Sequence, residues 1–123
     1  MNVAPKIQVL SIMLLAAGQI LLADITAPAN PTNVNPAVAF TKTVQPFLSA
    51  NCVGCHNAKV KTANLDLQQF TSVESVRANL KVWKKVAWKL QVGDMPPAKL
   101  PRPKPAAQKA TLKWINAELA AAK

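Results

Sequence analysis

The 123-residue chain has few of the residues that build metal centres: two cysteines, one histidine and five carboxylates. A single histidine excludes any site that takes two imidazoles from one chain. Two cysteines and one histidine also supply only three of the four nitrogen and sulfur ligands of a structural zinc site. The sequence shows no internal repeat and no alternation of polar and apolar residues typical of strands, so it favours helices.

The two cysteines and the histidine fall together, as Cys52, Cys55 and His56. This Cys-x-x-Cys-His run is the attachment sequence for c-type haem. Two thiols at this spacing can each add to one vinyl group of the porphyrin, and the adjacent imidazole can bind the iron from the same side. The motif predicts one covalent haem c, with Cys52 and Cys55 as attachment points and His56 as an axial ligand.

Three other interpretations of the motif stay open. A zinc site would need a fourth ligand, for which Asp66, Asp94 and Glu118 are the candidates. A thioredoxin-like redox pair is expected beside a βαβ pattern, which the sequence lacks. A structural disulfide would leave His56 without a role. Haem attachment is the favoured interpretation because it uses all three residues.

Residues 1–29 have the pattern of a secretory signal peptide. One early positive charge precedes an apolar stretch over 7–22, and small residues place cleavage after Ala23 or after Ala29. The sixteen residues of that stretch fall short of the ~20 that a membrane-spanning helix needs, and an uncleaved anchor is the alternative. We expect a periplasmic protein with a flexible linker over 30–37, followed by one domain over 38–123.

Three helices are predicted in this domain, over 38–50, 72–92 and 105–121. Pro46 is expected to kink the first helix or split it. A capping box of Thr71 and Glu74 is expected to begin the second helix. The expected core consists of the apolar residues that share a helical face: Phe40, Val44, Phe47, Leu48, Val73, Val76, Leu80, Trp83, Val86, Ala87, Leu90, Leu112, Trp114, Ile115 and Leu119.

Two features of the second helix lie outside its apolar face. Gly93 follows the helix as a C-terminal stop. Trp88 projects among lysines, where partial burial against a loop is expected. The alternatives are stacking under Lys84, contact with a haem propionate, and an exposed contact point. The lysines themselves are interpreted as a solvated face, with a partner surface as the alternative.

The candidate second axial ligand is Met95. The other methionines, Met1 and Met13, belong to the predicted signal peptide. Met95 lies between Gly93 and two prolines, which would hold its backbone rigid. A His/Met pair is typical of electron carriers and raises the reduction potential. The alternatives are a methionine that fills a gap in the core, a lysine ligand, or an open iron position.

The net charge of +10 favours acidic partners. We expect redox partner proteins with acidic docking surfaces, although a soluble surface is the simpler explanation of the charge. Nucleic acid is not expected for an exported protein whose basic residues form no long cluster. A monomer is expected, and peripheral association with a membrane is a further expectation.

These residues resemble small monohaem class I-type cytochromes c, and more narrowly the planctomycete-type cytochrome c domain. The resemblance covers roughly residues 38–119. It is carried by Phe40 to Phe47, by Cys52-Val53-Gly54-Cys55-His56, by Leu65-Asp66-Leu67, by Trp83, Val86 and Leu90, by Gly93-Asp94-Met95-Pro96-Pro97, and by Leu112 and Trp114-Ile115.

The resemblance implies an all-α, cytochrome c-like fold around one haem, with the first and last helices crossing near it. It implies Cys52 and Cys55 as thioether attachments, His56 as proximal ligand and Met95 as distal ligand. The implied function is single-electron transfer between redox partners rather than enzymatic catalysis. The main alternative is a haem-based ligand-binding or sensor domain with an open distal site, and a haem-free module binding through its basic surface is a third hypothesis.

Overall fold

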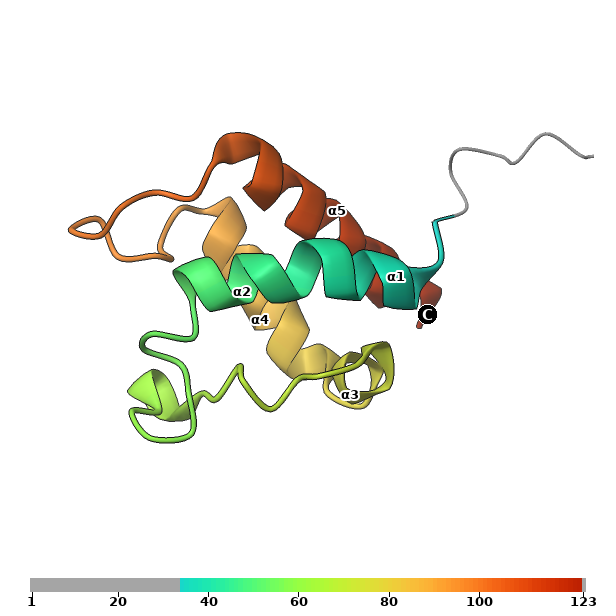
Figure 1. The fold of residues 1–123 in the computed structure, drawn as a ribbon, viewed down its shortest axis with the longest axis horizontal. Helices are drawn as coiled ribbons and strands as arrows, with labels where there is room; N and C mark the ends of the chain where they lie inside the picture. The colour runs from blue at the N-terminus through green and yellow to red at the C-terminus, as the bar shows by residue number, and fades with distance from the viewer. Residues whose placement is uncertain (1–33, 123) are drawn as a thin grey trace, which may run out of the picture.

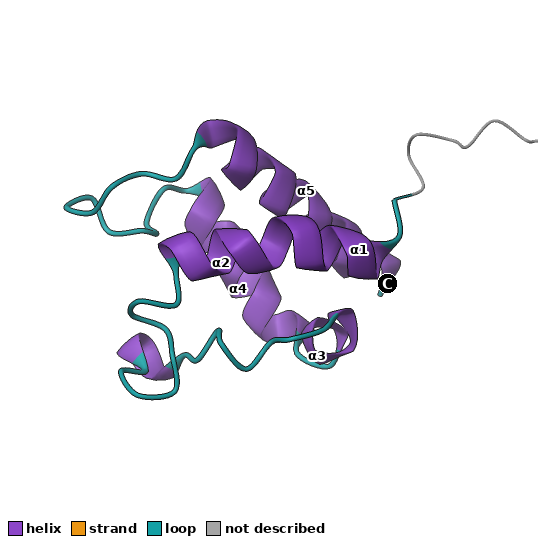
Figure 2. Ribbon diagram, viewed as in Figure 1, coloured by secondary structure: helices purple, strands orange, loops and turns teal. Residues whose placement is uncertain are grey.

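The computed structural model describes residues 34–122, and over that range it contains helices and loops but no strand (Figures 1 and 2). The predicted all-α fold is therefore confirmed. The elements follow in the order α1 (Pro36–Ala39), a π-helical segment (Phe40–Val44), α2 (Gln45–Asn51), a 3-10 turn (Thr62–Asn64), α3 (Val73–Arg77), α4 (Leu80–Gln91) and α5 (Pro105–Ala121). The predicted signal peptide, 1–29, lies outside the described residues.

The first helix begins at Pro36, two residues before Val38, where the helix was expected to begin. The side chain of Asn35 caps α1 by accepting a hydrogen bond from the backbone N–H of Ala37 at 2.9 Å. Pro36 occupies the first helical turn, where a missing N–H costs nothing. The end of the predicted linker, 30–37, is thus part of the first helix.

Pro46 does not interrupt the first helix, because the turn before it is widened. A proline ring inside a regular α-helix clashes with the carbonyl four residues earlier. Here the backbone N–H of Gln45 bonds to the carbonyl of Phe40, five residues back, in the π-helical segment. The chain therefore continues through α2 to the attachment motif.

The predicted second helix is two helices, α3 and α4, separated at Ala78 and Asn79. Asn79 leaves the helical region with φ −131°, and its side chain donates to the carbonyl of Ser75 at 3.0 Å. An asparagine side chain that bonds to the nearby backbone competes with the helical hydrogen bonds, which accounts for the break.

The helix cap also differs from the expected one. Ser72 caps α3 in a reciprocal pair with Ser75, in place of the predicted Thr71 and Glu74. The serine hydroxyl is short enough to reach the N3 backbone N–H while its own N–H is satisfied by the partner side chain.

The core lies where α4 and α5 pack together and α5 meets the first helix (Figure 1). Trp114 packs between two other aromatic rings of this core: its ring lies 5.3 Å from the Phe40 ring and 6.4 Å from the Trp83 ring, measured between centroids. Its indole N–H donates to the carbonyl of Pro36 at 3.0 Å, which joins α5 to the start of the domain. The predicted helical faces are buried as expected, with Leu80, Val86, Leu112 and Leu119 only partly so.

Trp88 is 53% exposed, so the expected partial burial against a loop is wrong. Its ring lies 4.7 Å from the Nζ of Lys89, not under Lys84. Among residues 34–122, no helix has the length and apolar character needed to cross a membrane.

Candidate haem site

The motif residues leave α2 in a series of tight turns. The backbone N–H groups of Cys52 and Val53 both bond to the carbonyl of Leu48, at 2.8 and 2.9 Å. The N–H of His56 then bonds back to the carbonyl of Cys52 at 2.9 Å. These local bonds bring the thiols of Cys52 and Cys55 and the His56 ring to the lining of one cavity.

His56 is held in the tautomer that an iron ligand needs. The residue is 8% exposed, and its Nδ1 lies 2.9 Å from the carbonyl oxygen of Thr62. A carbonyl oxygen can only accept, so Nδ1 carries the proton and Nε2 keeps its lone pair. A hydrogen bond on the far ring nitrogen is the usual support of a metal-binding histidine.

The Thr62 carbonyl is itself fixed by an unusual backbone. Lys61, Ala63 and Asn64 all have left-handed conformations, with φ of 46°, 56° and 58°. Non-glycine residues adopt this region at a cost, and it is found where a loop has to be shaped for a site. The N–H of Thr62 also bonds to the carbonyl of Cys55 at 3.1 Å, which ties this loop to the motif.

Both cysteines are free thiols, so the structure forms no disulfide between them. Burial raises the pKa of Cys52 to about 11, whereas Cys55 is exposed.

The candidate fourth zinc ligands are occupied elsewhere. Glu118 accepts from Arg77 Nε at 2.7 Å, Asp94 pairs with Lys89 at 2.7 Å, and Asp66 accepts from the N–H of Gln68 at 2.9 Å. Within residues 34–122, no group of three or more His, Cys, Asp and Glu side chains is placed to hold a metal ion. The zinc interpretation therefore has no support in the fold.

Met95 lines the same cavity from the loop that follows α4. Gly93 ends the helix with φ +77°, as predicted for its C-terminal stop. The N–H of Met95 bonds to the carbonyl of Lys89 at 3.2 Å, and Pro96 beside it is buried. Met95 itself is half-buried. The four candidate residues, Cys52, Cys55, His56 and Met95, thus meet at one place from two distant segments.

The cavity has a volume of about 420 Å³, within the range of cofactor sites. The loop that follows α2 (52–72, the attachment loop) and the loop over 92–104 leave the ends of α2 and α4 on the same side of the molecule (Figure 2). The cavity walls are mainly apolar and come from both loops and from α4: Leu65, Leu67, Val82, Val86, Leu90, Pro96, Pro97 and Leu100. An apolar cavity that combines two thiols, an imidazole with a free Nε2 and a thioether fits a covalently attached haem.

The cavity contains groups that the sequence did not reveal. Lys85 and Lys89 lie on its rim, although the lysines of α4 were interpreted as a solvated face. Their helical positions, one turn from Val82 and Val86, could have indicated this. The Thr62 carbonyl carries no sequence signal, because any residue could supply it.

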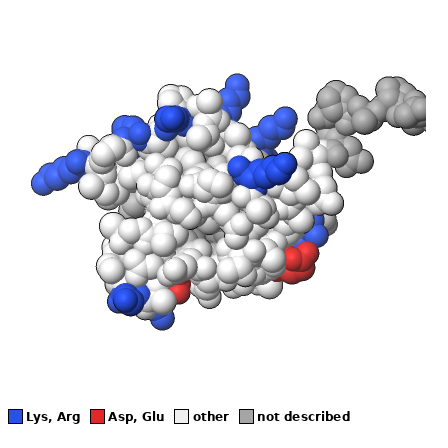
Figure 3. Space-filling model, viewed as in Figure 1, with Lys and Arg blue, Asp and Glu red and all other residues white. Residues whose placement is uncertain are grey.

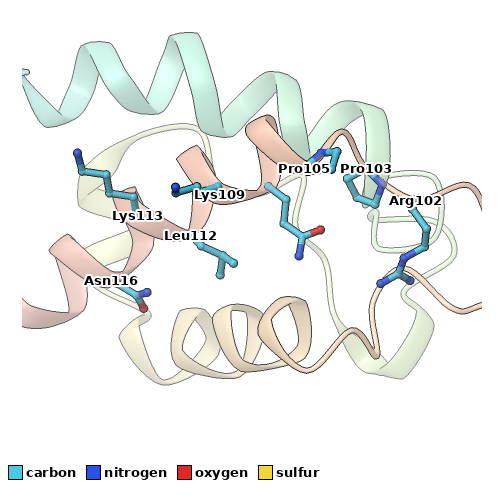
Figure 4. A pocket seen from close by; sticks show the side chains of 8 residues that line it. Arg102, Pro103, Pro105, Lys109, Leu112, Lys113 and Asn116 are labelled. Carbon is cyan, nitrogen blue, oxygen red and sulfur yellow. The ribbon is translucent and has the colours of Figure 1, made fainter.

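A second, larger cavity lies elsewhere. It has a volume of about 590 Å³ and forms a more open groove along α5, between Arg102 and Asn116 (Figure 4). None of the candidate haem residues lines it, so its size does not make it the site.

Residues 52–99 match the family model described as planctomycete cytochrome C. The matched segment begins at Cys52 and extends past Met95, so it contains all four candidate residues. The match confirms the resemblance noted from the sequence. No curated protein and no solved structure matches the chain.

Proposed function

We propose a function for this chain on the premise that residues 52–99 belong to the planctomycete cytochrome c family, which makes the protein a haem c-type cytochrome. We infer that it is an exported monohaem carrier of single electrons, with His56 and Met95 as the axial ligands. One haem is proposed because the two cysteines of the chain form a single attachment motif.

The observation that carries this proposal is the shared cavity. His56 lines it with Nδ1 engaged by Thr62 and Nε2 left to bind a metal, and Met95 lines it from the other loop. Haem iron supplies the one-electron couple, and a histidine–methionine pair favours a high reduction potential. The chain contributes the two donors, the thiols and an apolar wall that lowers the local dielectric.

The lining also favours electron transfer over acid–base catalysis. Apart from His56, its titratable side chains are two cysteines and the rim lysines Lys85 and Lys89, and it includes no carboxylate. A general acid or base is usually a histidine or a carboxylate near its working pKa. With His56 assigned to the iron, no such group is left in this cavity.

The proposed partners are redox proteins with acidic docking surfaces. Figure 3 shows lysines and arginines spread over one face of the molecule and few acidic side chains, in keeping with a net charge of +10. Such a field speeds encounter with acidic proteins and weakens at high salt. The periplasmic location rests on the signal-like pattern of residues 1–29.

Optical spectra of the exported protein test the proposal. We expect a low-spin, six-coordinate haem in both oxidation states and little or slow binding of carbon monoxide to the reduced form. Fast, stoichiometric binding of carbon monoxide would instead favour the ligand-binding or sensor hypothesis. The intact mass would report the number of haems and the mature N-terminus.

A further inference from the structure

The guanidinium of Arg102 ties residues 93–96 (the Met95 loop) to the chain just ahead of α5. Arg102 Nη2 donates to the carbonyl of Gly93 at 3.2 Å, and Nη1 donates to the carbonyl of Pro96. These two carbonyls flank Met95 in the sequence. Figure 4 shows the Arg102 side chain extending back toward the residues that directly follow α4. The planar guanidinium has donors in fixed directions, so it can fix the two carbonyls relative to each other.

We propose that Arg102 is a positioning residue for the distal ligand: it holds the loop in the shape that keeps the Met95 thioether in the haem cavity. The inference rests on the proposed role of Met95 as a ligand. A thioether is a weak metal ligand, so the conformation of its loop decides how firmly it binds.

Apart from the burial of Pro96, the other restraints on residues 93–96 are weaker. The N–H of Met95 makes one backbone bond, to Lys89. The pair between Lys89 and Asp94 is exposed, with side chains 43% and 50% accessible, and such surface pairs contribute little. Gly93 adds freedom rather than restraint, because glycine is the most permissive residue. Within residues 34–122, Arg102 is the only side chain that donates to the backbone carbonyls of residues 93–96, and its two hydrogen bonds lie on either side of Met95.

Arg102 acts on the loop and not on the core. Its residue is exposed, and the chain beside it is anchored separately by the buried Pro103. The end of α4 is also tied independently, because Gln108 Nε2 donates to the carbonyl of Leu90 at 3.0 Å. Removing the guanidinium should loosen the Met95 loop while the helices stay packed.

The experiment is a double-mutant cycle with imidazole as the probe. Imidazole competes with Met95 for the ferric iron of the haem-loaded protein, so its affinity reports how firmly the loop is closed. Loss of a charge-assisted hydrogen bond corresponds to about a tenfold change. We expect Arg102→Gln to raise the imidazole affinity about tenfold when Met95 is present and to leave it unchanged in the Met95→Ala background.

Two variants serve as comparisons. Lys99→Gln also removes one positive charge, from an exposed position in the same connection between α4 and α5. It should leave the imidazole affinity within twofold of the parent. Arg102→Lys keeps the charge but lacks the planar fork, so it should restore only part of the difference. Amide hydrogen exchange at Gly93, Asp94 and Met95 should speed up in Arg102→Gln and not in Lys99→Gln.

The outcomes separate the two proposals. If Met95→Ala tightens imidazole binding but Arg102→Gln does not, Arg102 has no positioning role and the proposed function stands. Equal effects of Arg102→Gln with and without Met95 would also overturn the inference, because the residue would then act on the fold in general. If Met95→Ala itself leaves imidazole binding unchanged, Met95 is no ligand and both proposals fail.

Discussion

The two sides of the haem cavity are built in different ways. On the His56 side, the backbone holds the ring: Nδ1 donates to the carbonyl of Thr62, and the carbonyl of His56 accepts from the N–H of Leu67 at 2.8 Å. On the Met95 side, a side chain holds the backbone: Arg102 donates to the carbonyls of Gly93 and Pro96, nine and six residues before it. The comparison teaches that haem attachment should withstand changes that open the distal side.

The largest expected effect is on the attachment side. Replacing both Cys52 and Cys55 by alanine removes both thioether bonds, so haem should be extractable with acidified solvent and the intact mass should lack it. Each single substitution should leave one bond and a weakened attachment. The exposed substitution Lys59→Ala, in the same loop, should retain covalent haem. A covalent haem mass in the double variant would contradict the assignment.

Met95→Ala should remove the distal ligand and leave the covalent attachment of the haem intact. The reduction potential should fall, because the thioether is lost as a ligand, and the iron should become open to carbon monoxide. The intact mass should still include one haem. Redox titration and carbon monoxide binding check this, and an unchanged potential with unchanged coordination would remove Met95 from the site.

The two glycines near the site offer a matched pair. Gly93 has φ +77°, and a Cβ there would also meet Arg102 Nη2 at 3.5 Å. A left-handed conformation costs an alanine roughly 1–2 kcal/mol, so Gly93→Ala should loosen the Met95 loop and tighten imidazole binding. Gly54 lies in open space without a positive φ, so Gly54→Ala should be close to neutral. Equal effects of Gly93→Ala and Gly54→Ala on imidazole binding would contradict the proposed difference between the Met95 side and the His56 side.

The smallest effect on the site is expected from Glu118→Gln. Glu118 is buried and accepts from Arg77, and this contact raises the pKa of Arg77. The substitution should lower the Tm, because it weakens the tie between α3 and α5, and it should leave the haem spectrum and potential as they are. Thermal unfolding and redox titration measure both, and an altered spectrum would mean that the sites are coupled through the core.

Several parts of this molecule could be predicted because their signals are local. The motif at 52–56 indicates covalent haem attachment by itself, without any other part of the chain. Counting the methionines was enough to single out Met95, and the helical faces of Phe40, Trp83 and Ile115 followed from their spacing. The all-α fold could be predicted for the same reason, because helical spacing is a local pattern.

Other features depend on contacts that the sequence does not contain. The break at Asn79 and the widened turn before Pro46 reflect local competition between hydrogen bonds and helical geometry. Arg102 reaches its partners only because the chain returns past the end of α4. The buried carboxylate of Glu118 would have been placed outside by its charge, and it is inside because Arg77 meets it.

The most direct test of the account is a proton NMR spectrum of the reduced, haem-loaded protein. If Met95 binds the iron, its methyl protons lie over the porphyrin face and are shifted far upfield by the ring current. The account predicts one such three-proton signal, absent in Met95→Ala. A reduced protein with no upfield methyl signal, or one that keeps the signal after Met95→Ala, would contradict the assignment of Met95 as the distal ligand.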